Sequence, residues 1–368
     1  MRNEIPMVAY AIDLRSDTKS LPTHAMKQAM MEAELGDDMT GEDPTVNRLE
    51  AHVAKMFGKE AAVLACSGTQ SNQMGVWAHT QRGDEILLEE KSHIGSWEAG
   101  APAILSGVTT RFIAGDQGKL DIPHLAGMLR ADDQHLTPSR LLCIENTTNA
   151  GGGGCYTLEH LHRVCQWARE QGLKVHMDGA RFFHAVIAQD YDPAEACRYI
   201  DTISLCFSKG LGCPLGSILV GSHADIQKAR RARKIFGGAL RQSGMFAAAA
   251  QYALDHHVER LQQDHRHARL FAEEIASIPG IVVDPEKVET NLVFFELERD
   301  RGYASQLSAR LKELGIGIGA MGAQRLRACF YIGITAADVH QAARLVAEAM
   351  QDNLTELPVA ANGPYARG

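Results

Sequence analysis

The sequence predicts an α/β fold in which a large domain with a mostly parallel sheet precedes a smaller C-terminal α+β domain. Through the first two thirds of the chain, strand-like apolar segments alternate with amphipathic helical segments. This alternation indicates a parallel sheet that is covered by helices on both faces. After Pro279-Gly280 the pattern changes to two strand-like segments that bracket one helix, which indicates the second domain.

The large domain is expected to contain six strands, at 61–66, 85–88, 140–144, 174–177, 202–207 and 217–220. Helical periodicity fits five segments, 23–34, 46–57, 69–80, 157–171 and 222–234. A longer helical stretch follows over about 241–278, and we expect its residues 264–267 (Asp-His-Arg-His) to lie on the polar face.

The smaller domain is expected to contain strands at 291–297 and 325–332, with a helix at 303–314 between them. A final helix runs to about Gln351 from Thr335, whose hydroxyl suits an N-cap. These patterns predict an N-terminal arm and large domain over 1–257, a small domain over 258–352 and a flexible tail over 353–368.

The composition is that of an ordinary globular protein, because 45% of the 368 residues are hydrophobic and 22% are charged. A net charge of −8 argues against nucleic acid or an anionic membrane as a partner. The eight cysteines form no C-x-x-C pair, so we expect buried free thiols and a cytoplasmic location. Early charged residues argue against a signal peptide, and no histidine spacing suits a metal site.

Two neighbouring strands are each followed by a residue that can do chemistry. Lys209 comes directly after the apolar strand at 202–207, and Asp178 ends the strand before it. Ligands bind at this edge of a parallel sheet, where a desolvated lysine becomes nucleophilic. A lysine that bonds to an aldehyde, next to a carboxylate that keeps a pyridine nitrogen protonated, is what pyridoxal 5'-phosphate (PLP) requires. The alternatives are a loop lysine for Lys209 and a helix N-cap for Asp178.

Two further segments could complete a cofactor site. Ser67-Gly68-Thr69-Gln70 lies between a strand and a helix, where free N–H groups and the helix dipole favour a phosphate. His93 lies among small residues after the strand at 85–88 and could stack on a flat ring and act as an acid–base group. Taken alone, the first segment is a common turn and the second holds an ordinary loop histidine.

In combination, these segments resemble the threonine aldolase family, a beta-eliminating-lyase-like group of fold-type-I PLP enzymes. The resemblance runs from Asp13 to about Thr335. Its motifs occur in the family's order: residues 13–18 (DLRSDT), 36–46 (GDDMTGEDPTV), 67–70 (SGTQ), 178–181 (DGAR), 208–212 (SKGLG) and 241–244 (RQSG).

The resemblance implies roles for the cofactor residues. Lys209 would form the internal aldimine, Asp178 would pair with the pyridinium nitrogen, and His93 would stack over the ring. Gly68 and Thr69 would hold the phosphate. Further cofactor contacts would come from Arg181, Lys234 and Arg241, the last two near a subunit boundary.

The resemblance also implies the substrate and the assembly. Ser16, Arg181 and Arg327 would hold the substrate carboxylate, a task that suits the arginine fork. The reaction would be retro-aldol cleavage of the Cα–Cβ bond of L-threonine, L-allo-threonine or a bulkier phenylserine-type amino acid, which yields glycine and an aldehyde. The family forms homotetramers in which active sites are shared between subunits.

The substrate side departs from the family at three positions. Thr148 stands where a histidine is usual, Thr40 replaces a tyrosine, and Tyr331 stands at another histidine position. The pocket beyond Cβ is therefore expected to be roomier and to lack a base, with Thr40 and Thr148 lining it. Beta-elimination, racemisation or transamination with the same cofactor is the alternative reaction. A catalytically silent relative is a further hypothesis, which the presence of Lys209, Asp178 and Arg327 disfavours.

Overall fold

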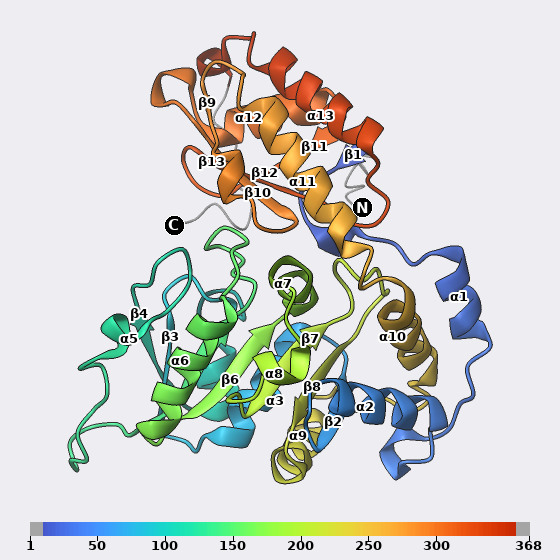
Figure 1. Cartoon of the computed structure of the whole chain (residues 1–368), viewed down its shortest axis with the longest axis vertical. Coiled ribbons are helices and arrows are strands. Elements are labelled where there is room, and N and C mark those ends of the chain that lie inside the picture. Colours follow the sequence, from blue (N-terminus) through green and yellow to red (C-terminus); the bar gives the residue numbers. More distant parts are fainter. Residues whose placement is uncertain (1–9, 358–368) are drawn as a thin grey trace, which may run out of the picture. The chain divides into compact units, whose positions relative to one another are not determined.

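The computed structural model describes residues 10–357, and the chain divides into two compact units. Unit 2 comprises Ser20–Gln262, and unit 1 combines the N-terminal segment up to Lys19 with the chain from Gln263 onwards. Residues 10–19 were expected to belong to the large domain. They belong to unit 1 because β1 (Ile12–Asp13) pairs with β11 (Ile316–Gly317). Figure 1 shows the elements of both units.

Unit 2 is built on a seven-stranded sheet with the strand order β2-β8-β7-β6-β5-β3-β4. Only β8 runs antiparallel to its neighbours, which confirms the mostly parallel sheet. The six predicted strands all form, and β4 was not predicted because only one of its five residues is buried. The bounds are β2 (Ala61–Ala65), β3 (Glu85–Glu89), β4 (Thr109–Ile113), β5 (Ser139–Glu145), β6 (Lys174–Gly179), β7 (Thr202–Cys206) and β8 (Ser217–Gly221).

Helices cover both faces of this sheet because alternate strand residues point to opposite sides. On β5, Leu142 and Ile144 join one apolar cluster with α6, whereas Leu141 and Cys143 join another with α3. This burial explains the almost continuously apolar strand segments. The helices are α1 (His24–Met31), α2 (Pro44–Met56), α3 (Gly68–His79), α4 (His93–Ser96), α5 (Ile122–Leu125), α6 (Leu158–Glu170), α7 (Phe182–Gln189), α8 (Pro193–Ala196), α9 (His223–Ile235) and α10 (Gly244–His256).

The carboxyl ends of the parallel strands position the chemistry of unit 2. Because β2, β3, β5, β6 and β7 run in one direction, the segments that follow them leave the same edge of the sheet. This is the edge at which open α/β sheets bind ligands. It carries the start of α3, the segment of His93 and the segments that follow Glu145, Asp178 and Cys206.

Unit 1 is an α+β structure, as predicted. Its main sheet has the strand order β12-β13-β10-β9, with antiparallel pairs throughout. Thr335 caps the last helix and accepts a hydrogen bond from the Asp338 backbone nitrogen, as expected. The bounds are α11 (Leu261–Ile275), which starts within unit 2, β9 (Ile281–Val282), β10 (Leu292–Leu297), α12 (Ala304–Glu313), β12 (Gly319–Ala320), β13 (Arg325–Cys329) and α13 (Ala336–Ala349).

The prediction of one continuous helical stretch over about 241–278 is wrong, because the chain forms two helices there. The first, α10, ends at His256, and α11 begins at Leu261. Asp264 and His267 are buried, contrary to the expected polar face. The reason is helical spacing: positions 264, 267, 271 and 275 share one face, on which Phe271 and Ile275 enter the apolar core.

Three smaller expectations can be compared with the structure. All eight cysteines have free thiols, and seven are buried, as predicted. The expected tail begins with a short 3₁₀ turn at Leu354–Glu356 in which Leu354 is buried, and residues 358–368 lie outside the described part. Within residues 10–357, no helix combines the length and the apolar character needed to cross a bilayer.

Candidate active site

Lys209 lies in the turn that follows β7, close to the start of α3. Its backbone carbonyl accepts hydrogen bonds from Ser20 Oγ at 2.8 Å and from the Gly212 backbone nitrogen at 2.9 Å, which fix the turn. Its Nζ atom is 3.7 Å from Cys206 Sγ. A Cβ atom on Gly68 would lie only 2.6 Å from the same sulfur, so only glycine permits this close approach. The lysine amine and the first turn of α3 therefore meet at one sulfur atom.

The first turn of α3 is a ready-made anion site. Ser67 caps the helix by accepting a hydrogen bond from the Gln70 backbone nitrogen at 3.2 Å. The first N–H groups of a helix have no partner inside it, so those at Gly68 and Thr69 can bind an anion. Cys66 Sγ donates to the Gly238 carbonyl at 3.3 Å, which brings the segment after α9 against this turn.

Asp178 is held by two hydrogen bonds at the end of β6. Its Oδ2 atom accepts from Asn72 Nδ2 at 2.8 Å, and its Oδ1 atom accepts from the Ala180 backbone nitrogen at 3.0 Å. The residue is 3% exposed. Within the described residues, no basic side chain forms an ion pair with this carboxylate. The site therefore holds a buried negative charge that can pair with a cationic group of a ligand.

His93 begins α4 and forms a charged pair with Glu98. Its Nδ1 atom is 2.9 Å from Glu98 Oε1, and the Glu98 side chain also accepts from Asn72 Nδ2 at 2.9 Å and Gln73 Nε2 at 2.6 Å. Burial alone would lower the pKa of His93, but the bond to Glu98 and the charge of Asp178 raise it above its ordinary value. His93 therefore binds its proton more tightly than an ordinary histidine does.

The ligand atoms of His93, Glu98 and Asp178 lie within 4.8 Å of one another. Such a cluster could hold a cation, yet its atoms already bond to each other and to Asn72. We therefore interpret the cluster as a hydrogen-bonded acid–base group rather than a metal site.

Glu145 is a functional candidate that the sequence analysis did not name. It ends β5 directly beside Asp178 in the register, and its oxygens accept from the backbone nitrogens of His93 at 2.7 Å and Asn149 at 2.6 Å. Burial, together with the negative charge of Asp178, raises the pKa of Glu145 to about 7. The side chain therefore joins the His93 segment to the segment of Thr148.

Thr148 and Arg181 flank this segment. Arg181 is 6% exposed, and its Nη1 atom donates to Asn149 Oδ1 at 3.3 Å. Thr148 is 1% exposed, and a Cβ atom on Gly118 would lie 2.9 Å from its Cβ. The threonine is thus packed against the turn of Gly118 rather than open to solvent.

Two predicted substrate residues, Ser16 and Arg327, lie in unit 1. Arg327 is buried on β13, and its Nη2 atom donates to the Arg15 carbonyl at 3.1 Å, next to Ser16. Ser16 Oγ accepts hydrogen bonds from both the nitrogen and the hydroxyl of Thr18. Tyr331, at a position where the family has histidine, donates to the Asp13 carbonyl at 2.6 Å.

Thr40 and Arg241 contact the same residue, Asp37, and Lys234 lies on α9. Thr40 is exposed and its hydroxyl donates to the Asp37 carbonyl at 3.1 Å, while Arg241 Nη1 pairs with Asp37 Oδ2 at 2.9 Å. Lys234 is exposed near the end of α9. The structure thus brings Thr40 and Arg241 together on one aspartate, and within residues 10–357 neither forms a hydrogen bond with Lys209, Asp178 or His93.

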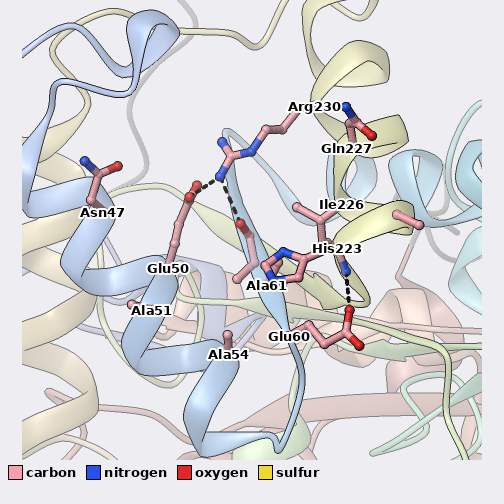
Figure 2. A pocket seen from close by; sticks show the side chains of 12 residues that line it. Asn47, Glu50, Ala51, Ala54, Glu60, Ala61, His223, Ile226, Gln227 and Arg230 are labelled. Atoms are coloured by element: carbon pink, nitrogen blue, oxygen red, sulfur yellow. Dashed lines mark hydrogen bonds and ion pairs between the residues drawn. The ribbon is translucent and has the colours of Figure 1, made fainter.

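A separate hollow of about 690 Å³ opens between α2, β2 and the start of α9 and contains none of the predicted residues. Figure 2 shows Glu50 and Arg230 facing each other across it, joined by an ion pair. Burial raises the pKa of Glu50 although Arg230 opposes the shift. Because the Glu50 oxygens are taken up by Arg230 and the Leu64 backbone nitrogen, this pair stabilises the fold of unit 2.

Comparison with known proteins adds to this geometry. Residues 13–298 match the model of the beta-eliminating lyase family. The chain belongs to this family. Among the curated beta-eliminating lyase relatives, low-specificity L-threonine aldolase 1 of Arabidopsis thaliana is 40% identical over 350 residues, which are 94% of this chain and 98% of that protein. The low specificity L-threonine aldolase of Escherichia coli K12 is also 40% identical, over 86% of this chain and 92% of its own length.

The solved structures agree with the assignment to the beta-eliminating lyases at the level of the fold. The threonine aldolase of Leishmania major superposes with a TM-score of 0.80 at 18% identity, covering 92% of this chain and 99% of that one. The predicted fold, that of the large and small domains of fold-type-I PLP enzymes, is confirmed.

Proposed function

We propose that the chain is a PLP-dependent lyase that cleaves a β-hydroxy-α-amino acid to glycine and an aldehyde. The substrate would be L-threonine, L-allo-threonine or a bulkier phenylserine-type amino acid. The observation that carries the proposal is the meeting of the Lys209 amine with the anion-binding turn of α3, on the edge that also carries Asp178. The names of the curated relatives support the same reaction.

The residues fit PLP on two structural grounds. Only glycine at position 68 allows the α3 turn to approach Cys206 and the lysine, which leaves backbone N–H groups for a phosphate. Asp178 is a buried carboxylate without a basic partner in the described part of the chain, and a protonated ring nitrogen would supply the missing positive charge. Lys209, Asp178, Gly68, Thr69 and His93 would hold the cofactor, with Arg181, Lys234 and Arg241 as further contacts.

When bound, PLP supplies a positively charged ring that accepts the electron pair released as the Cα–Cβ bond breaks. The chain supplies positions and protons. Asp178 would keep the ring nitrogen protonated, and His93, whose pKa the bond to Glu98 helps to raise, would stack on the ring and move protons near Cβ.

The substrate carboxylate would be bound by Ser16, Arg181 and Arg327, since a buried guanidinium provides charge-assisted hydrogen bonds. Thr148 offers only a hydroxyl near the position of the family's histidine, so it cannot take the β-hydroxyl proton at pH 7. The same proposal includes a homotetramer with shared active sites and a cytoplasmic location.

The test combines cofactor trapping with product analysis. Borohydride reduction followed by peptide mapping should find the pyridoxyl group on Lys209, and Lys209→Ala should lose both the label and nearly all turnover. Lys55→Ala, which changes an exposed lysine on α2, serves as the matched control. The label on another lysine contradicts the site. A keto acid and ammonia, in place of glycine and an aldehyde, contradict the reaction.

A further inference from the structure

The amide of Asn72 joins the two buried carboxylates of the site. Its Nδ2 atom donates to Asp178 Oδ2 at 2.8 Å and to Glu98 Oε1 at 2.9 Å. Both protons of the amide are therefore used, one on the acid proposed to face the ring nitrogen and one on the acid that pairs with His93. Asn72 is 2% exposed, so no water competes for these bonds.

A chain of hydrogen bonds behind Asn72 fixes the direction of this amide. Because the nitrogen faces two carboxylates, the oxygen must accept, and His176 Nε2 donates to it at 3.2 Å. Burial lowers the pKa of His176 to about 3, so the ring is neutral and its Nδ1 atom accepts from the Thr202 hydroxyl at 2.9 Å. His79 Nε2 in turn donates to Thr202 Oγ1 at 3.0 Å.

Every donor in this chain has one acceptor, so the tautomer of His176 and the direction of the Asn72 amide determine each other. A reversed Asn72 amide would place its oxygen against two negative carboxylates and face its nitrogen towards the Nε2–H of His176.

We propose that Asn72, oriented by neutral His176, is a positioning residue that holds Asp178 and Glu98 together and thereby keeps Asp178 ready to bind the cofactor ring. This inference rests on the proposed function, because it assigns Asp178 to PLP. It adds residues that never touch the cofactor or the substrate. Asn72 acts through the two carboxylates, and His176 acts through Asn72.

The packing of α3 supports this role of His176. A Cβ atom on Gly75 would lie 2.4–2.5 Å from atoms of the His176 ring, so the glycine leaves room for the imidazole directly against the helix. The charged and titratable groups around this chain of hydrogen bonds come from α3, α4 and the segment after it, α9, the neighbouring strands and the turn after β7: His79, His93, Glu98, Cys143, Glu145, Cys206, Lys209 and Asp225. None of them reaches the Asn72 oxygen in the described structure, which leaves His176 to orient the amide.

Two substitutions of His176 separate its two bonds. In His176→Gln the amide nitrogen lies where Nε2 lies and can still donate to Asn72. In His176→Asn the shorter side chain can still meet Thr202 but cannot reach Asn72. The two variants are equally polar and both lose the aromatic ring, so a purely structural role of the ring would affect them alike.

The measurements are the dissociation constant of PLP, by absorbance titration of the full chain after cofactor removal, and kcat and KM of the reloaded enzyme. We expect His176→Gln to retain most of the affinity and His176→Asn to bind PLP roughly tenfold more weakly, the effect of one misplaced hydrogen bond to a charged group. We also expect kcat to fall in His176→Asn with little change in the KM of the amino acid. Gly75→Ala, which pushes the ring aside, should resemble His176→Asn although alanine favours a helix.

Equal PLP affinities of the two His176 variants, with similar melting temperatures, overturn the positioning role while leaving the proposed function intact. If the asparagine variant fails to fold, Gly75→Ala decides: unchanged PLP affinity there also overturns the role. Failure of the unaltered protein to bind PLP overturns the proposed function and this inference together.

Discussion

His93 Nδ1 lies 2.9 Å from Glu98 Oε1, and the Glu98 side chain is completely buried while that of His93 is 30% exposed. An imidazole that donates to a buried carboxylate is stabilised in its protonated form, which is why the pKa of His93 is raised although burial opposes the shift. The acid–base properties of His93 therefore depend on Glu98, a buried residue five positions further along the chain.

Glu98→Gln should lower the pKa of His93 because a neutral amide cannot stabilise the imidazolium charge. The measurement is the pH dependence of modification by diethyl pyrocarbonate, which attacks neutral imidazole, followed at His93 by peptide mapping. The modification should begin at lower pH in the variant. His135, an exposed loop histidine paired with Asp133, is the internal control. An unchanged profile at His93 would remove Glu98 from this role.

Glu145→Gln should change how stability depends on pH in the cofactor-free protein. The folded-state pKa of Glu145 is raised to about 7 by burial and by Asp178, above an unfolded value of about 4.3. Because the pKa is raised, the stability that Glu145 contributes is fully present at a pH below its pKa in the unfolded chain. This stability is lost as the pH rises towards 7, at up to ~1.4 kcal/mol per pH unit. Urea unfolding between pH 4 and 8 should show the wild type losing stability relative to the variant.

The control for this series is Glu159→Gln, because the Glu159 side chain is 91% exposed on α6. Its stability difference from the wild type should be constant over the same pH range. A constant difference for Glu145→Gln as well would show that folding does not shift the pKa of Glu145, which would contradict the raised value.

Arg327→Leu should mainly weaken amino-acid binding and leave PLP affinity nearly unchanged. The guanidinium is buried on β13. A hydrogen bond to a charged group contributes roughly 1.5–3 kcal/mol, so its removal should weaken substrate binding ~10–150-fold. The measurement is the spectral titration of the holoenzyme with the amino acid. Arg344→Leu, which changes an exposed arginine on α13, is the control. Unaltered substrate affinity in Arg327→Leu would contradict the assignment.

Phenylserine-type substrates should be cleaved with higher kcat/KM than threonine, and Thr148→His should shift the ratio towards threonine. Loss of a base costs about 10²–10⁴-fold, and a readily leaving aromatic aldehyde reduces that cost. Thr148 is packed against Gly118, so the imidazole needs movement of that turn. Thr148→Val keeps the shape without a base and should leave the ratio unchanged. A threonine preference in the wild type, or no shift in Thr148→His, would refute the argument.

Local sequence patterns predicted most of the fold because six of the seven strands of the large sheet are short apolar runs, and helical repeats follow most of them. Lys209 and Asp178 could be found for the same reason, since both stand where a strand ends. The break between α10 and α11 could not be predicted, because residues 257–260 contain neither proline nor glycine. There the change of direction depends on tertiary packing rather than on a local signal.

The role of Asn72, which supports the site, could not be predicted from the sequence for a different reason. Asn72 and Asp178 are separated by 106 positions and meet only in the folded sheet. A polar residue inside a helix usually indicates a solvent-facing position, and only the burial of Asn72 reveals its role. The available signal was the position of Asn72 on the second turn of α3, directly behind the predicted phosphate turn.

The pairing of β1 with β11 has a consequence for how the protein is made. The segment of Ile12 leaves the ribosome early, yet its partner at Ile316 is synthesised about 300 residues later. Unit 2 is continuous from Ser20 to Gln262 and can fold during translation, whereas unit 1 must wait for the end of the chain. Ile12 and Leu14 therefore stay uncovered until the residues that bury them have been synthesised.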